Sequence, residues 1–302
     1  MKTLITSLII GCLSLPLLAQ NAPAIASDIE KQTLTFVERD SALELDFYQQ
    51  KGDSETRPCL IFIFGGGFVE GARDVPYYNE YYNFLVEHGI KVAAIDYRLG
   101  LRGRFEEVGI FNTAPLKESI DMAVEDLYAA TGYLLDHADE LGIDPERVFI
   151  SGSSAGAITS LHGDWYKRNN DALSVVLPDG FQYRGVIAFA GAIFSDAGKP
   201  DYDHDPAPTL FFHGTDDATV PYHKRKLFSK GFFGSAFLAD RFEDAGYTYC
   251  FFSVEGAGHE IAGSPIYDHQ PEIWQFIRTA ILDDQRYQME TSLKVLADAE
   301  ND

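Results

Sequence analysis

A serine in a glycine-flanked turn is the feature of this sequence that most clearly offers chemistry. Ser154 lies in the run Gly152-Ser153-Ser154-Ala155-Gly156, after an apolar stretch and before a helical pattern. A strand that turns directly into a helix leaves little room for side chains, and the glycines and the small alanine let the backbones approach. The run predicts a nucleophile elbow. Because so short a pattern also arises by chance, its partners must be found elsewhere in the sequence.

A histidine is the first partner that such a serine requires, because a base must remove the hydroxyl proton. His259 follows the apolar run 251–254 in a glycine-rich turn, which places it at a predicted strand end. His213 also follows an apolar run and competes for the role. Its place directly on the strand favours a structural function, so we predict His259 as the base.

The second partner is a carboxylate that orients the base. The polar loop after the apolar run 210–212 carries two neighbouring aspartates, Asp216 and Asp217. Both follow a predicted strand, and their position alone leaves the choice between them open.

A glycine loop after the apolar run 61–64 can supply donors for the oxyanion that forms when a serine attacks a carbonyl group. Gly65, Gly66 and Gly67 are adjacent, and no side chains shield their backbone N–H groups. A tight turn without function would have the same composition. A phosphate-binding loop would need a lysine and a hydroxyl residue, and both are absent from this motif.

Alternating strand and helix patterns must position these residues. The segments 34–37 and 45–48 alternate in polarity, as an antiparallel pair does. The later strand candidates are continuously apolar, as in a parallel sheet covered by helices. They are 60–64, 92–95, 148–150, 186–189, 210–212 and 250–254, and helical patterns span 77–88, 116–137, 155–168, 235–245 and 270–282. The sequence predicts one α/β domain at 28–283 with a mostly parallel sheet of about eight strands and helices on both faces. The polar tail 284–302 is expected to fray or to extend the last helix.

The charge of the chain argues against two classes of partner. Among 302 residues, 46 are acidic and 24 are basic, which gives a net charge of −22. This charge repels nucleic acids and anionic membrane surfaces. No stretch after the N-terminal segment is apolar enough to span a bilayer, so we expect neither nucleic-acid binding nor stable membrane insertion. The oligomeric state stays open.

The N-terminal segment 1–19 predicts a secretory signal peptide. Lys2 precedes an apolar stretch, and Ala19 is a small residue where cleavage could occur. Cys12 loosely fits a bacterial lipoprotein signal, but the residues after it stay apolar instead of forming a polar tether. We expect a secreted or periplasmic protein, with a lipid anchor on Cys12 as the alternative.

The remaining cysteines and one acidic run were considered as further sites. Cys59 and Cys250 lie inside strand-like runs, so two buried free thiols are expected and a disulfide is the alternative. The acidic run 201–205 lacks the glycine and glutamate of an EF-hand. It leaves a looser surface metal site open, but we expect an acidic rim near the active site and predict no metal.

Two segments bear on how the site is covered. The stretch 194–208 is too short for a full helical lid, which predicts a minimal cap. The aromatic run 75–84 has the spacing of a helix that packs into a core. A sugar or aryl site on these rings is the alternative.

Taken together, these residues resemble the α/β-hydrolases of the secreted carboxylesterase and feruloyl-esterase-like (BD-FAE-like) group, which is related to hormone-sensitive-lipase-like esterases. The resemblance covers residues 34–282. In that fold the catalytic triad runs in the order Ser, Asp, His. The family's acid motif aligns with the run 214–221 and implies Asp217 rather than Asp216 as the acid.

The resemblance also implies an oxyanion hole and shows one departure. The implied donors are the backbone N–H groups of Gly66, Gly67 and Ala155. The runs 95–99 (Ile-Asp-Tyr-Arg-Leu) and 144–147 (Asp-Pro-Glu-Arg) match further family features. Many relatives have a histidine before the three glycines, whereas this chain has Phe64, so the hydrogen bond of that histidine is missing.

The sequence thus predicts a serine hydrolase that cleaves carboxylic esters through an acyl-enzyme without a cofactor. Ser154 would attack, His259 would transfer the proton, and Asp217 would orient His259. The resemblance implies acetyl or feruloyl esters on polysaccharide as substrates. An exopeptidase of the prolyl-peptidase type and a non-catalytic binding protein on the same fold are the alternatives.

Overall fold

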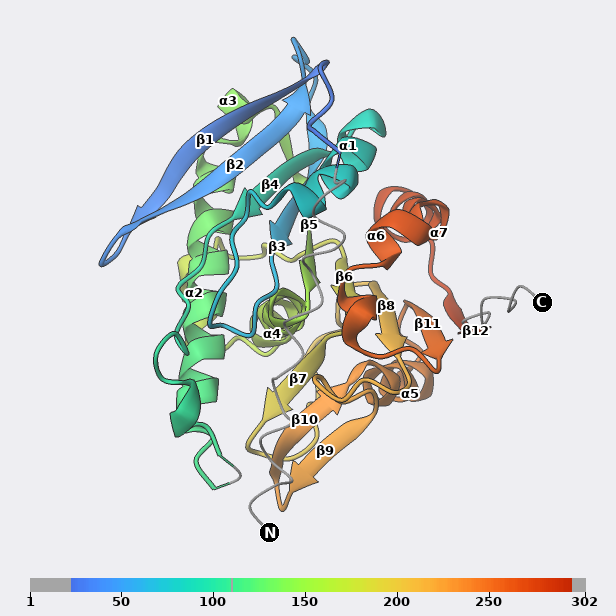
Figure 1. Cartoon of the computed structure of the whole chain (residues 1–302). Coiled ribbons are helices and arrows are strands. Elements are labelled where there is room, and N and C mark those ends of the chain that lie inside the picture. The colour runs from blue at the N-terminus through green and yellow to red at the C-terminus, as the bar shows by residue number, and fades with distance from the viewer. Residues whose placement is uncertain (1–22, 110, 295–302) are drawn as a thin grey trace, which may run out of the picture.

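A twisted, mostly parallel sheet forms the centre of the protein (Figure 1). The computed structural model describes residues 23–109 and 111–294. Within them, nine strands form the main sheet in the order β1-β2-β4-β3-β5-β6-β8-β11-β12. Their bounds are β1 Ile29–Glu38, β2 Ala42–Gln50, β3 Arg57–Ile63, β4 Lys91–Ile95, β5 Ile143–Ser153, β6 Val186–Phe189, β8 Thr209–Gly214, β11 Tyr249–Glu255 and β12 Gln288–Lys294. Strands β1 and β2 are antiparallel to their neighbours, and the strands from β4 to β12 run parallel.

Helices cover both faces of this sheet. On one face α2 packs against α4, and on the other α1 packs beside α6. The helices are α1 Asn79–Glu87, α2 Ala114–Asp136, α3 Ala138–Leu141, α4 Ala155–Arg168, α5 Ser235–Ala245, α6 Pro265–Asp268 and α7 Gln270–Phe276, and α7 continues as π-helix over Ile277–Leu282. Each predicted helix is present, and the predicted α/β-hydrolase architecture is confirmed.

Burial explains why the central strands are continuously apolar. The residues of β4, β6 and β8 are buried on both faces of the sheet, so alternation would leave polar groups without water. Strand β1 lies at the edge of the sheet, and only Ile29 and Phe36 of its ten residues are buried. All eight strands predicted from these two patterns are present.

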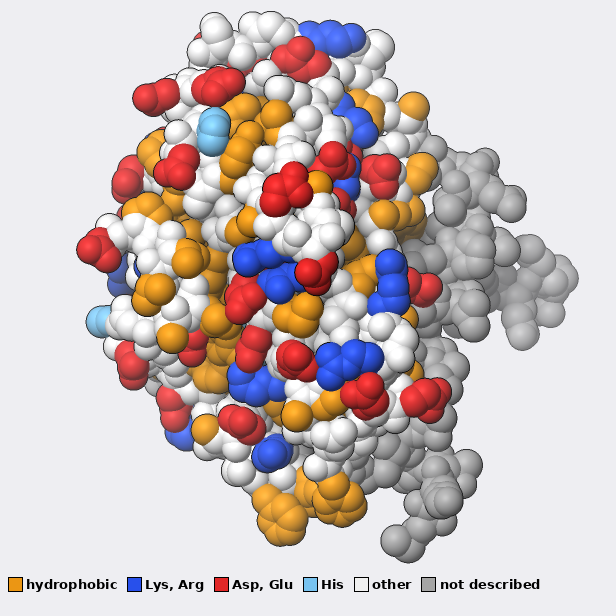
Figure 2. Space-filling view, turned by 90° about the vertical axis from the view of Figure 1, so that its left-hand side faces the viewer, with side chains coloured by type: hydrophobic (Ala, Val, Ile, Leu, Met, Phe, Trp, Pro, Cys, Tyr) orange, Lys and Arg blue, Asp and Glu red, His pale blue; other side chains and the backbone are white. Residues whose placement is uncertain are grey.

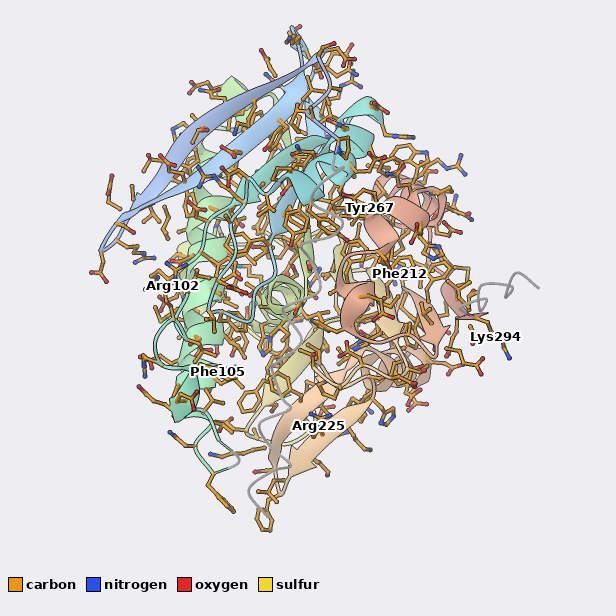
Figure 3. The ribbon with its side chains drawn as sticks, in the orientation of Figure 1. Arg102, Phe105, Phe212, Arg225, Tyr267 and Lys294 are labelled. Carbon is orange, nitrogen blue, oxygen red and sulfur yellow. The ribbon has the colours of Figure 1, made fainter. Side chains whose placement is uncertain are left out.

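A second, smaller sheet lies beyond the carboxyl ends of the main strands. It contains β7 (Ala192–Ser195), β10 (Lys230–Gly234) and β9 (Lys224–Leu227), in that order. The chain reaches β7 two residues after β6, so β7 extends past the main sheet toward the first turns of α4. This sheet takes the place of a helical lid, and Arg225 marks its outer strand in Figure 3.

The C-terminal segment differs from its prediction. Residues 288–294 neither fray nor extend the last helix; they form β12, which pairs in parallel with β11 at the edge of the sheet. The prediction was wrong because β12 is polar, with exposed and half-buried residues alternating along it. Half-buried edge strands give a weaker sequence signal than strands buried on both faces.

Three further expectations concern the core and the termini. Cys59 and Cys250 are both buried free thiols, as predicted. They lie on β3 and β11, four strands apart and therefore roughly 19 Å apart in the sheet, too far for a disulfide. No helix among the described residues is long and apolar enough to cross a membrane. The predicted signal peptide, 1–19, lies outside the described residues.

The aromatic run packs into the core, as expected from its spacing. Tyr77, Tyr78, Tyr81 and Tyr82 are all buried. The rings of Tyr78, Tyr81 and Tyr82 contact Phe62 of β3 at centroid distances of 4.7 to 5.8 Å. These contacts fix α1 beneath the glycine loop that follows β3.

Candidate active site

Ser154 occupies the sharp turn between β5 and α4. Its backbone has φ 51° and ψ −114°, which is strained for a residue with a side chain. The turn depends on two glycines. A Cβ on Gly152 would overlap the backbone of Gly156, and a Cβ on Gly156 would overlap the carbonyl oxygen of Ile63 on β3.

The structure brings Ser154, His259 and Asp217 together in one hydrogen-bonded chain. Ser154 Oγ lies 2.8 Å from His259 Nε2, and His259 Nδ1 lies 2.7 Å from Asp217 Oδ2. They come from the ends of β5, β11 and β8, and Phe212 marks the end of β8 in Figure 3. Asp216, the alternative acid, is exposed, and its carboxylate accepts from Thr215 instead. The arrangement lets His259 remove the Ser154 proton while Asp217 orients the ring.

Asp217 is enclosed by donors. Its Oδ1 accepts the backbone N–H groups of Thr219 and Val220, at 2.8 and 2.9 Å. Its Oδ2 lies against His259 and, at 3.3 Å, against Nε2 of the fully buried His213. Burial by itself would raise the pKa of Asp217, but the hydrogen bonds and charges of His213 and His259 outweigh it and hold that pKa well below its usual range. Asp217 therefore stays ionised beside His259.

The glycine loop after β3 passes directly beside the nucleophile. A Cβ placed on Gly65 would lie 3.4 Å from the Cβ of Ser154. Gly66 and Gly67 have φ values of 123° and 64°, a region that favours glycine. Ala155 is the first residue of α4, where backbone N–H groups have no acceptor within the helix. Gly67 and Ala155 line the same pocket as Ser154, and the role of the Gly66 N–H as a donor stays a prediction.

Two tyrosines anchor this loop in place of the missing histidine. The Phe64 ring stacks on Tyr97 with 4.4 Å between ring centroids, and Tyr97 OH donates to the carbonyl of Phe64 at 3.1 Å. Tyr78 OH accepts the N–H of Gly65 at 3.3 Å. The departure from the family pattern at Phe64 is thus compensated by contacts from the strand end after β4 and from the segment before α1.

A narrow apolar pocket opens next to Ser154. Its volume is about 40 Å³. It is lined by Gly67, Phe68, Leu116, Ser154, Ala155, Ile158, Thr219, Val220, Pro221 and Phe232. Leu116 comes from α2 and Phe232 from β10, so the small sheet supplies one wall of the site.

The acidic run does not form a rim near the active site, and that prediction was wrong. The carbonyl of Asp201 accepts from Trp165 and Asn169, at 2.8 and 2.9 Å. Trp165 lies about 15 Å along α4 from Ala155, so the run packs near the far end of the helix. The Asp201 carboxylate pairs there with Arg241 at 2.7 Å. In the parts of the chain that the structure describes, no three His, Cys, Asp or Glu residues gather closely enough to hold a metal ion.

Sequence reasoning missed the contact between His213 and Asp217. The two are four residues apart across the end of β8, and a strand that bends into a tight loop brings such positions together. It also missed Tyr78, Tyr97, Leu116 and Phe232. Their roles depend on how α1, α2 and the small sheet pack around the turn, which local sequence patterns do not specify.

Comparison with known proteins is consistent with this geometry. Residues 45–191 match the BD-FAE family. The chain is 34% identical over 100 residues to a fumonisin B1 esterase of Sphingopyxis macrogoltabida, which covers 33% of this chain and 18% of that protein. It is 29% identical over 176 residues to an acetyl esterase of Salmonella paratyphi B, with 56% of this chain and 49% of that protein covered. The chain therefore spans less than half the length of these relatives.

Solved structures share the fold over most of the chain. Apo esterase 2 of Thermogutta terrifontis aligns with a TM-score of 0.61 and 22% identity, covering 85% of this chain and 96% of that one. Its propionate-bound form aligns with a TM-score of 0.60 and 22% identity, covering 85% and 95%. From the parallel sheet, the serine on its strand-to-helix turn and these matches, we conclude that the chain has the α/β-hydrolase fold and is similar to BD-FAE and hormone-sensitive-lipase-like carboxylesterases.

Proposed function

We propose that this protein is a serine hydrolase that cleaves carboxylic esters through an acyl-enzyme. The observation that carries the proposal is the hydrogen-bonded chain from Ser154 through His259 to Asp217, with 2.8 and 2.7 Å between the bonded atoms. The glycine loop beside Ser154 and the similarity to esterases support it.

In the first half of the reaction, Ser154 Oγ attacks the ester carbonyl while His259 Nε2 takes the hydroxyl proton. The carbonyl electron pair moves to the oxygen, and the N–H groups of Gly66, Gly67 and Ala155 are suited to stabilise that oxyanion. The bond from carbon to the alcohol oxygen then breaks. His259 gives its proton to the departing alcohol, and the acyl group stays on Ser154.

In the second half, water replaces the alcohol. His259 takes a proton from water as its oxygen attacks the acyl carbon, and the same donors hold the second oxyanion. The bond to Ser154 breaks, His259 returns the proton to Oγ, and the carboxylic acid leaves. His259 thus acts as the base at the start of each half and as the acid at its end.

Acetyl or feruloyl esters on carbohydrate are the substrates that we propose within this class. The family that residues 45–191 match and the acetyl esterase among the relatives support this choice. Export of the protein, which we propose from the pattern of residues 1–19, would bring it to polymeric substrates outside the cell. The mass of the protein recovered after expression tests export, because it shows whether the N-terminus is intact. Loss of residues 1–19 is expected, and an intact N-terminus would contradict export. A lipid on Cys12 would support the alternative anchor.

Replacement of the nucleophile tests the activity. Ser154→Ala should lower kcat for ester hydrolysis at least about 10³-fold, because no other group can form the acyl-enzyme. Ser229→Ala, in the exposed turn of the small sheet, is the matched control and should keep wild-type activity. A fluorophosphonate probe should label wild type and Ser229→Ala but not Ser154→Ala.

Three outcomes would overturn the proposal. Full esterase activity in Ser154→Ala would place the nucleophile elsewhere. Hydrolysis of dipeptide amides in preference to esters would favour the exopeptidase, and a folded wild type with neither turnover nor labelling would favour a binding protein.

A further inference from the structure

A basic hairpin with an aromatic tip projects from the small sheet. We propose that this hairpin and a neighbouring exposed ring dock the protein on anionic lipid bilayers, with the rings in the headgroup layer and the basic side chains against the lipid phosphates. The residues of this hairpin surface are Phe111, Arg225, Lys226, Leu227, Phe228 and Lys230. Such docking is reversible and needs no membrane-spanning helix, and it does not depend on the ester hydrolysis proposed above.

The charge of the hairpin is opposite to that of the whole chain. The run 224–230 (Lys-Arg-Lys-Leu-Phe-Ser-Lys) contains four basic residues and no acidic one, in a chain with a net charge of −22. Strand β9 is exposed along its whole length, and Lys230 is exposed at the start of β10. All four cations therefore face solvent, and an anionic surface is their complement.

The tip of the hairpin carries a large ring at a position that favours glycine. Phe228 follows β9 and begins the two-residue turn to β10, with a φ of 56°. Tight hairpin turns require such a positive φ, and glycine or asparagine normally supplies it because a bulky side chain is strained there. Phe228 is 87% exposed, so its ring gains little packing that would offset the strain. Strain of this kind points to a function for the exposed ring.

A second exposed ring lies at the same end of the molecule. Phe111 precedes α2 and is 91% exposed. Thr113, two residues further along the chain, lines the same groove as Lys230 of the hairpin. In Figure 1 the segment before α2 and the turn between β9 and β10 both reach the lower end of the molecule. Two separate parts of the chain thus present apolar rings beside exposed basic side chains.

The shape and chemistry of this surface favour a bilayer over other anionic partners. Phe228 lies at a projecting tip, so a folded protein partner would need a hollow that fits the ring. The interface of a bilayer accepts aromatic rings without a preformed pocket, while lysine and arginine side chains contact its anionic headgroups. An anionic polysaccharide would satisfy the charges, but it is hydrated and would not bury the aliphatic side chain of Leu227 beside the ring.

The acidic residues around the hairpin do not cancel its charge. Four acidic side chains line the groove beside Lys230, and three of them pair with basic residues. The pairs are Glu118 with Arg104 at 3.0 Å, Asp121 with Lys117 at 2.6 Å and Glu125 with Arg98 at 2.7 Å. More distant carboxylates act through solvent, where the Debye length of about 8 Å at 0.15 M salt limits their repulsion of the lipid. The net charge therefore opposes approach from a distance more than contact at the tip.

The hairpin surface adjoins the candidate active site. Arg225 pairs with Phe232 across β9 and β10, and residues directly opposite each other share a face of the sheet. Phe232 lines the pocket beside Ser154. It lies four residues from Phe228, or about 13 Å along the strand, which exceeds the roughly 5–8 Å of one headgroup layer. A protein docked by its tip therefore keeps the pocket in water beside the bilayer.

Sedimentation with lipid vesicles tests the proposal. Vesicles of equal parts phosphatidylcholine and phosphatidylglycerol present an anionic surface, and vesicles of phosphatidylcholine alone do not. At about 0.15 M salt, wild type should bind the mixed vesicles at least about tenfold more tightly than the neutral ones. Equal binding to both, or binding to neither, would overturn the proposal. Retention of wild type by a polygalacturonate resin without binding to the mixed vesicles would also overturn it and favour an anionic polysaccharide.

Paired charge variants test the assignment of the basic residues. Each basic side chain at an anionic lipid surface adds about fivefold to the affinity, so Arg225→Gln/Lys226→Gln should bind the mixed vesicles at least about tenfold more weakly than wild type. Arg286→Gln/Lys294→Gln removes the same residue types from other exposed positions and should bind like wild type. Figure 3 shows Lys294 well away from Arg225. Equal losses in the two double variants would mean that only net charge matters and would overturn the role of the hairpin.

Variants of the tip separate lipid binding from folding. Glycine adopts a φ of 56° without strain, so Phe228→Gly should fold and still bind the mixed vesicles at least about fivefold more weakly. Phe228→Trp keeps a ring and should retain the affinity, with a blue shift of its fluorescence on binding. Wild-type affinity of Phe228→Gly, or no shift in Phe228→Trp, would overturn the role of the tip. All variants share the N-terminal segment of wild type, so any affinity of residues 1–19 for lipid is common to them.

Discussion

His213 gives the Asp217 carboxylate a second histidine contact, behind the one that His259 makes. Its Nε2 lies 3.3 Å from Asp217 Oδ2 and 3.1 Å from the carbonyl of Val220. Its Nδ1 lies 2.8 Å from Ser235 Oγ at the start of α5. Two acceptors around Nε2 require the proton there. The ring thus links the acid loop to α5 and donates to the acid from inside the core.

This contact makes His213→Leu a test of how Asp217 is held. A hydrogen bond to a charged group contributes about 1.5–3 kcal/mol, so we expect a loss of about that size in the free energy of unfolding at pH 7. His213→Gln keeps a hydrogen-bond donor, so its free energy of unfolding should fall less than that of His213→Leu. Urea unfolding of both variants and wild type measures the difference, and equal stability of His213→Leu and wild type would contradict the contact.

The pH dependence of the same measurement separates the Asp217 contact from general packing. The pKa of Asp217 is depressed in the folded protein, so its stabilisation is present above the unfolded value of about 3.9 and is lost as the pH falls through the folded pKa. Without the His213 donor the folded pKa is less depressed. The free energy of unfolding should therefore fall less in acid for His213→Leu than for wild type. If it falls equally with pH in both proteins, the substitution acts through packing alone.

At the scale of elements, the small sheet depends on one histidine of α4. His162 is fully buried, and its Nδ1 lies 2.7 Å from the carbonyl of Ile158 in the preceding turn. Its Nε2 accepts the backbone N–H of Phe194 on β7 at 3.1 Å. Burial lowers the pKa of His162 despite these backbone contacts. The neutral ring is thus the form that holds β7 against α4.

This arrangement predicts a loss of stability in mild acid. Since the folded pKa of His162 lies below the unfolded value of about 6.5, the unfolded chain binds the proton more readily. The free energy of unfolding should fall as the pH drops below about 6.5 and level off below the folded pKa. His162→Gln should flatten this part of the curve, and thermal melts between pH 7 and 5 measure it. A variant that is as acid-sensitive as wild type would place the titrating group elsewhere.

The elements differ in how well the sequence predicts them, for a physical reason. Strands such as β3 and β8 are buried on both faces, and their continuous apolar runs identify them directly. The small sheet cannot be identified from apolar runs in this way, because β9 is exposed along its whole length. Its pairing is decided by β10 and β7, which lie in separate parts of the sequence.

The residues of the candidate site also divide into those that local sequence patterns predict and those that only the packing of distant elements determines. Ser154 and His259 could be predicted because a strand-to-helix turn and a strand-end loop leave local patterns. The choice of Asp217 over Asp216 rests on the resemblance to the family. Leu116 and Phe232 could not, because a residue becomes a pocket wall only through the packing of distant elements. The misplaced acidic run illustrates this limit, since only the tertiary structure shows which end of α4 it meets.

At the scale of the whole molecule, acidic charge dominates the surface. The chain carries 46 acidic and 24 basic residues, so many carboxylates have no basic partner. Figure 2 shows acidic side chains spread over the face in view, with basic ones between them. Exposed pairs such as Lys294 with Glu255 contribute at most about 1 kcal/mol each. Repulsion among the surplus carboxylates opposes the compact state.

Screening this repulsion should stabilise the protein. The Debye length falls from about 30 Å at 0.01 M salt to about 8 Å at 0.15 M, which weakens interactions between distant surface carboxylates more than those within close pairs. We expect the melting temperature to rise between these concentrations of sodium chloride. A gain on the order of 1 kcal/mol would correspond to about 2–4 °C. Potassium chloride at equal ionic strength is the control, because screening by monovalent ions should be the same. A melting temperature that falls with either salt would mean that the close ion pairs stabilise the fold more than the surplus charge opposes it.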